Sequence, residues 1–359
     1  MKRAMGMTVI AALVAACATA PRTVARPRPA IAAQGAANVP ERPRDMSGVI
    51  AFVRAIGTSD PQRAAHLRRA MAWSFAFADE ARARMAPFEP NMIMWVENNG
   101  ALVREPDAIA QRDAERRASL ERMDHAMEFA VSCAQRALRL EPNAPEAPAV
   151  LLELGGRLAQ WARDADGPYA EFVRRFHGHS QVGEAHLGLG VAFAFRRRFE
   201  EAKASLEQAA RLGTPAVRAV AQLNLSQIAY IERRYDESVE LARLVLREPS
   251  ARELERDAVF QIGSAMAEGG ASEAALIAAF RADIAPRAEG LVREFLRAVL
   301  LSGASDEATL RAAMALFVEA ASGQRAAFCA LERPRESVAS SELLVDEVGA
   351  LRRRTGCPW

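Results

Sequence analysis

The sequence predicts an all-α protein built from repeated helix-turn-helix units. Two consecutive segments between Gly183 and Pro249 match each other at a constant offset of thirty-six residues. Each segment divides into two halves with apolar residues at helical spacing, which is typical of helical repeats. The rest of the chain is rich in Ala, Leu and Arg and lacks the valine- and threonine-rich alternating runs that predict strands.

Small residues mark the places where the two helices of a unit are expected to approach each other. Helix backbones come close only where side chains are small, so these positions predict the packing within each unit. We expect three facing pairs in successive units, namely Gly190 with Ala202, Ser226 with Ser238, and Gly263 with Ala275.

The order of residues in each unit resembles the tetratricopeptide repeat. Leu189-Gly190, an aromatic at Phe193, Phe199-Glu-Glu-Ala and a late proline follow one another, and the second unit repeats most of this order. A weaker third unit runs from about Leu254 to Pro286. The resemblance implies an α-solenoid with a concave groove lined by the first helices.

The turn between the helices departs from the family pattern. The family carries Gly and Asp at this place, whereas this chain carries Arg196-Arg197-Arg198 in one unit and Glu232-Arg233-Arg234 in the next. We expect the turn to form with a basic edge.

Residues 1–17 resemble the signal peptide of a bacterial lipoprotein. Lys2 and Arg3 precede an apolar stretch that is too short to span a bilayer, and Val14-Ala15-Ala16-Cys17 follows it. The resemblance implies lipidation of Cys17 and, with Ala18 after it, sorting to the outer membrane with the protein facing the periplasm. An ordinary signal peptide with a cysteine nearby is the alternative.

Four further regions follow the signal peptide. Residues 18–45 form a Pro- and Arg-rich tether, and residues 46–140 an N-terminal helical region. Residues 141–286 hold the repeats, and residues 287–359 a C-terminal helical cap that covers the last apolar face. The apolar run Met92–Val96 breaks the helical pattern and is either a core insertion or an exposed patch that docks a partner.

The cysteines other than Cys17 predict no metal or redox motif. Cys133 lies within an amphipathic segment and is expected to be a small buried apolar residue. Cys329 and Cys357 form a disulfide in an oxidising compartment or remain free, and the sequence leaves both options open.

No catalytic residue, metal ligand set or cofactor motif stands out. His177, His179 and His186 are the one histidine cluster, without supporting carboxylates at ligand spacing. The motifs of zinc proteases, α/β-hydrolases, phosphate-binding loops and dinucleotide sites are absent. With a net charge of +2, the composition gives no electrostatic case for nucleic-acid binding.

The resemblance also implies which first-helix residues face the groove. The set is largely apolar and suits an amphipathic helix or an extended apolar segment of a partner, although the chain's own terminal helices are an alternative occupant. Among these residues, Asn224 alone fits the pattern that binds a C-terminal carboxylate. The set comprises Leu187, Val191, Ala194, Phe195, Leu223, Asn224, Gln227, Tyr230, Ile231, Phe260 and Ser264.

These features favour a non-catalytic envelope scaffold that binds other periplasmic or outer-membrane proteins, in a pilotin-like or assembly-factor role. One alternative is a lipoprotein component of a periplasmic solute-uptake system, which requires a ligand cavity. Another is an envelope hydrolase, whose site would form a polar cleft in residues 46–140.

Overall fold

The computed structural model describes residues 41–85, 95–98, 101–104, 106–160, 164–303, 306–334, 341–357 and 359. Cys17, most of the tether and Met92–Met94 lie outside these ranges. The described residues form two compact units, one up to Leu154 and the other from Gly155 onward. Each unit is treated by itself below.

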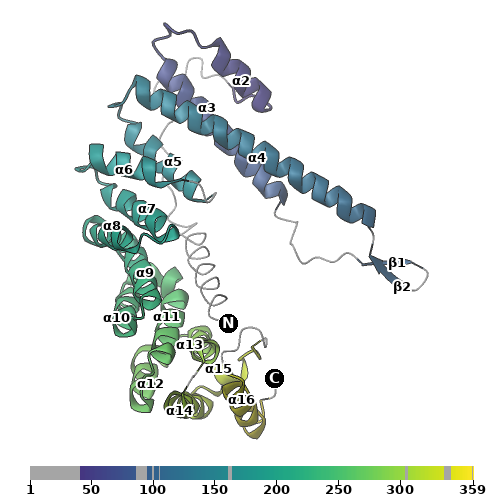
Figure 1. Cartoon of the computed structure of the whole chain (residues 1–359), viewed down its shortest axis with the longest axis vertical. Coiled ribbons are helices and arrows are strands. Elements are labelled where there is room, and N and C mark those ends of the chain that lie inside the picture. Colours follow the sequence, from purple (N-terminus) through teal and green to yellow (C-terminus); the bar gives the residue numbers. More distant parts are fainter. Residues whose placement is uncertain are drawn as a thin grey trace. The chain divides into compact units, whose positions relative to one another are not determined.

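Helices dominate both units, which confirms the expected all-α class (Figure 1). The unit up to Leu154 contains α2 (Met46–Ala55), α3 (Arg63–Met85), α4 (Pro106–Leu140) and the start of α5 (Ala147–Gln160). The unit from Gly155 continues with α6 (Asp166–Arg175), α7 (Val182–Phe195), α8 (Phe199–Leu212), α9 (Pro215–Ile231), α10 (Tyr235–Leu246), η1 (Pro249–Leu254), α11 (Glu255–Glu268), α12 (Glu273–Ala279), η2 (Phe280–Ile284), α13 (Glu289–Ser302), α14 (Glu307–Gly323), α15 (Arg325–Cys329) and α16 (Glu342–Arg354).

A short hairpin interrupts the helices. Strands β1 (Trp95–Asn98) and β2 (Ala101–Arg104) pair antiparallel, with Trp95 opposite Arg104 and Asn98 opposite Ala101. The hairpin begins within the run Met92–Val96, which the sequence marks as a break in the helical pattern, although the all-α class included no strand there. The sequence held the signal, because two short runs separated by Asn-Gly are the strongest short-range indication of a hairpin.

The long helices α3 and α4 pack along each other and form the core of the first unit. Leu67, Met71 and Phe75 of α3 are almost completely buried, as is Met127 of α4. Cys133 is buried and unbridged, and burial raises the pKa of its thiol to about 11, opposed by Arg136. The apolar stripe of α3 therefore contributes to the packing of the core.

In the second unit each of α6 to α11 packs against its neighbours in the sequence. Two of the expected small-residue pairs meet. A Cβ added to Gly190 would lie 3.1 Å from the carbonyl oxygen of Ala202, and the Ser226 hydroxyl donates to the carbonyl oxygen of Ser238 at 2.7 Å.

The third expected pair is wrong. A Cβ on Gly263 would lie 2.8 Å from the Cβ of Ala298 in α13, whereas Ala275 is exposed. The reason is a change of partner, because α11 packs mainly against α10 and α13 while α12 packs against α14.

The arginine-rich turns adopt the same geometry as a glycine turn. Arg197 and Arg233 have φ values of 60° and 62°, close to the 68° of Gly270 in the next turn. After α7 the amide of Arg198 donates to the carbonyl of Phe193 and that of Arg197 to Ala194. These two bonds define a Schellman cap, in which the first residue past the helix takes the left-handed conformation. The turn therefore forms without glycine, as expected.

Candidate protein-binding face

The predicted groove residues come from three helices that contact one another, because α7 packs against α9 and α9 against α11. On α9 four of the five predicted residues recur at positions i, i+4, i+7 and i+8 from Leu223, which places them on one side of the helix, and Asn224 at i+1 borders them. Leu187, Val191 and Phe195 on α7 recur at i, i+4 and i+8. We call the surface made by the predicted residues the α7–α9–α11 face.

The α7 part of this face is apolar and partly open. Leu187 and Val191 are half-buried and pack against the small core cluster around Leu206. Phe195 is 37% exposed at the end of the helix, so it is the most accessible aromatic ring of the predicted set. Buried Ala194 lies beneath these larger side chains and contributes packing.

On α9 the predicted apolar residues differ in accessibility. Leu223 is only 2% exposed and belongs to the hydrophobic core, so it does not line an open surface. Tyr230 and Ile231 are half-buried. The Tyr230 ring meets Tyr235 edge-on at 5.7 Å between centroids, and burial raises the pKa of the Tyr230 hydroxyl, with Glu268 adding to the effect.

Two buried amide side chains distinguish this part of α9. Asn224 and Gln227 are 3% and 8% exposed. The Asn224 Nδ2 donates to the carbonyl of Val220 at 2.8 Å, but its Oδ1 accepts nothing from the described residues. The Gln227 Oε1 likewise has no donor among them. Because a buried polar atom without a partner costs about 1–3 kcal/mol, such atoms often mark a site that is completed by a ligand.

One polar residue next to the predicted set, His186, also has a ring nitrogen without a hydrogen-bond partner among the described residues. His186, which precedes Leu187 on α7, has a Nδ1 atom without a partner in the described structure, and burial lowers its pKa. His186 lies one turn before Gly190, whose added Cβ would meet Leu206 of α8, so the helix spacing places it on the α8 side and not with Leu187.

On α11, Phe260 is half-buried and Ser264 is buried. At the two ends of the same helix, burial raises the carboxyl pKa of Asp257 and of Glu268. The face therefore combines apolar side chains with hydrogen-bond acceptors. This chemistry suits a polypeptide partner that supplies apolar anchors and N–H donors.

No metal-binding group of side chains is found at this face in the described part of the chain. Within the described ranges, no group of three or more His, Cys, Asp or Glu side chains is placed to hold a metal ion. The described helices also include none that is both long and apolar enough to cross a bilayer.

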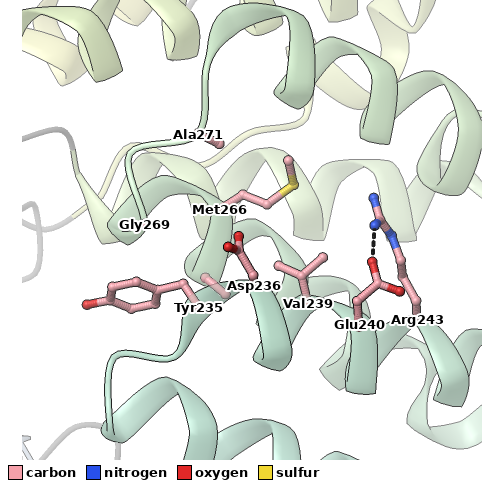
Figure 2. Close-up of a pocket in the computed structure, with 9 residues that line it drawn as sticks. Tyr235, Asp236, Val239, Glu240, Arg243, Met266, Gly269 and Ala271 are labelled. Carbon is pink, nitrogen blue, oxygen red and sulfur yellow. Dashed lines mark hydrogen bonds and ion pairs between the residues drawn. The ribbon is translucent and has the colours of Figure 1, made fainter.

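A pocket of about 250 Å³ lies outside this face, between the start of α10 and the end of α11 (Figure 2). Val239, Ala265 and Met266 form its apolar part. Asp236 and Glu240 contribute carboxylates to its rim, and sequence reasoning singled out neither residue.

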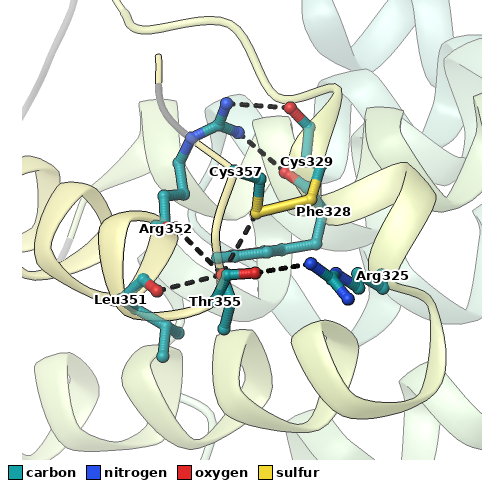
Figure 3. The surroundings of a disulfide bond; sticks show 7 residues. All are labelled: Arg325, Phe328, Cys329, Leu351, Arg352, Thr355 and Cys357. Atoms are coloured by element: carbon teal, nitrogen blue, oxygen red, sulfur yellow. Dashed lines mark hydrogen bonds between the residues drawn. A yellow bond between two sulfur atoms is a disulfide. The ribbon is translucent and has the colours of Figure 1, made fainter.

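The C-terminal helices are joined by a disulfide between Cys329 and Cys357, the pairing that the sequence left open (Figure 3). Their Cα atoms lie 5.1 Å apart. Next to the disulfide, the buried Arg352 guanidinium donates to the carbonyl oxygens of Phe328 and Cys329, at 2.8 Å each, and lies 4.3 Å from the Trp359 ring centroid. We call this arrangement the C-terminal clasp.

Comparison of the sequence with protein-family models and with curated proteins gives no match.

Proposed function

We propose that this chain is a non-catalytic envelope scaffold: a lipid-anchored solenoid of tetratricopeptide-like units that binds another periplasmic or outer-membrane protein through the α7–α9–α11 face. Cys17 carries the lipid in this proposal, and the Pro- and Arg-rich tether separates the anchor from the helices. The bound segment of the partner is an amphipathic helix or an extended apolar strand.

The observation that carries the proposal is the pair of unpartnered oxygens on α9. Asn224 Oδ1 and Gln227 Oε1 are buried among apolar side chains without a donor in the described residues. Replacing such atoms by apolar ones stabilises a purely structural face. In this proposal the two amide side chains turn outward on binding, and their oxygens, which are closed off from solvent in the free chain, then receive donors from the partner. Exposed Phe195 supplies the kind of aromatic anchor that dominates protein interfaces.

The test is site-specific photocrosslinking in membranes of the source cell. A benzophenone amino acid replaces Phe195, and in a matched control it replaces Val318, which is 52% exposed on α14 and lies outside the face. We expect discrete adducts from position 195 that are missing from position 318. Gln227→Leu in the same chain is expected to weaken them, because the partner loses an acceptor.

Identical adducts from both positions, or adducts that Gln227→Leu leaves unchanged, would contradict the proposal. The anchor is checked in the same membranes with Cys17→Ser, which removes the lipidated side chain. This variant is expected in the soluble fraction or as an unprocessed precursor, and unchanged extraction behaviour would contradict lipidation.

A further inference from the structure

The pocket between α10 and α11 has an apolar floor and one carboxylate without a cationic partner. Val239 and Met266 are 7% and 8% exposed, and Ala265 is fully buried beneath them. Figure 2 shows the Asp236 carboxylate directed toward Met266, while the carboxylate of Glu240 is turned toward Arg243.

The two carboxylates differ in their charge balance. Glu240 Oε1 accepts from Arg243 Nη1 at 2.6 Å, so the Glu240 carboxylate has a cationic partner, which it shares with Asp283 because Arg243 Nε donates to Asp283 at 2.8 Å. Asp236 has no ion-pair partner in the described parts of the chain. The carboxylate of Asp236 therefore stands next to the apolar floor without a cationic partner in the described structure.

The volume decides the size of the ligand. At about 250 Å³ the pocket is smaller than the roughly 300–1,000 Å³ of sites for drug-sized molecules, so it holds a single side chain. A side chain that complements an apolar floor and one carboxylate has an apolar stem and a compact cationic end. Lysine has this shape, whereas the guanidinium of arginine carries five donors that one carboxylate cannot satisfy.

We propose that this pocket is a second binding site, which receives a lysine side chain of a partner protein. The four-carbon stem lies on Val239, Ala265 and Met266, and the ammonium group pairs with Asp236. None of the lining residues belongs to the α7–α9–α11 face, so the site is independent of the function proposed above.

The test uses Nα-acetyl-lysine methylamide as the probe and the methyl resonance of Met266 as the readout. The full chain is labelled at methionine methyl groups, and Met266→Leu assigns the resonance by its loss. We expect a saturable shift with the lysine probe. The uncharged Nα-acetyl-norleucine methylamide, which has the same stem, is expected to bind about three- to fivefold more weakly, as for an exposed ion pair.

Two substitutions that each remove one negative charge test which carboxylate contributes to the binding of the lysine probe. Asp236→Asn is expected to weaken the lysine probe by the same three- to fivefold and to leave the norleucine probe unchanged. Glu237→Gln is the control, because the neighbouring Glu237 carboxylate pairs with Arg234 and does not line the pocket. No saturable shift, equal binding of the two probes, or equal effects of the two substitutions would overturn the proposal.

Discussion

At the scale of single residues, the most informative positions are those where a side chain stands in an unfavourable environment. Arg197 and Arg233 have positive φ, a conformation that costs a residue with a Cβ about 1–2 kcal/mol. Asp257 is a partly buried carboxylate whose pKa is raised mainly by burial and further by Glu294, against the opposing effect of Arg256.

Replacing Arg197 by glycine is expected to raise the free energy of unfolding by about 0.5–1 kcal/mol, because glycine adopts positive φ without strain. The converse change, Gly270→Ala at the equivalent place in the third turn, is expected to lower the free energy of unfolding. The nearest atom to the added Cβ is Thr309 Oγ1 at 3.7 Å, so no clash interferes and the loss reports backbone strain alone. Chemical denaturation measures both, and a destabilised Arg197→Gly would contradict the assigned conformation.

Asp257 predicts a pH dependence of stability. Because its pKa is higher in the folded than in the unfolded protein, the folded state binds the proton more tightly, and stability is lost as pH rises through the interval between the two pKa values. Asp257→Asn is therefore expected to melt at a higher temperature than the wild type at pH 7 and to lose this advantage near pH 3. Asp346→Asn, at an exposed position of α16, is the control and should show no such difference.

At the scale of secondary-structure elements, close packing of helices depends on a few small residues. A Cβ on Gly190 would lie 2.7 Å from Leu206 Cγ, so α7 and α8 approach as closely as a glycine allows. The helices at the C-terminal end are held together in a different way. The C-terminal clasp ties α15 to the residues after α16 through a covalent bond and through Arg352, which caps the carbonyls of α15.

Loss of the disulfide is expected to lower the free energy of unfolding by about 3–4 kcal/mol, because Cys329 and Cys357 are 28 residues apart and the bond restricts the unfolded chain. The Cys329→Ser/Cys357→Ser double variant should unfold at lower denaturant concentration than the wild type. A reducing agent should destabilise the wild type and leave the variant unchanged. Equal stability of the two proteins under oxidising conditions would show that the bond adds nothing.

At the scale of the whole molecule, the sequence predicted the helices far better than it predicted their partners. Helical spacing is local, so the two helical units between Gly183 and Pro249 were readable in advance, although nothing in that pattern identified Thr214-Pro215 as the start of α9. The partner of Gly263 was not, because the choice of α13 over α12 depends on how distant helices stack.

The α7–α9–α11 face was likewise only partly predictable from the sequence. The resemblance to the tetratricopeptide repeat implied which first-helix residues face the groove, yet it could not separate buried Leu223 from exposed Phe195. It also gave no sign that the oxygens of Asn224 and Gln227 lack donors, since hydrogen bonding depends on the three-dimensional surroundings of each atom.

The measurement that tests the central claim most directly is the thermal unfolding of Gln227→Leu in the absence of any partner. If Gln227 Oε1 is kept without a donor for binding, an apolar replacement should raise the free energy of unfolding by about 1 kcal/mol. Gln261→Leu on α11 is the matched control and should lower it by a similar amount, because Gln261 donates to Ser238 Oγ at 3.0 Å. A destabilised Gln227→Leu would contradict the account, since it would mean that the amide is already satisfied within the fold.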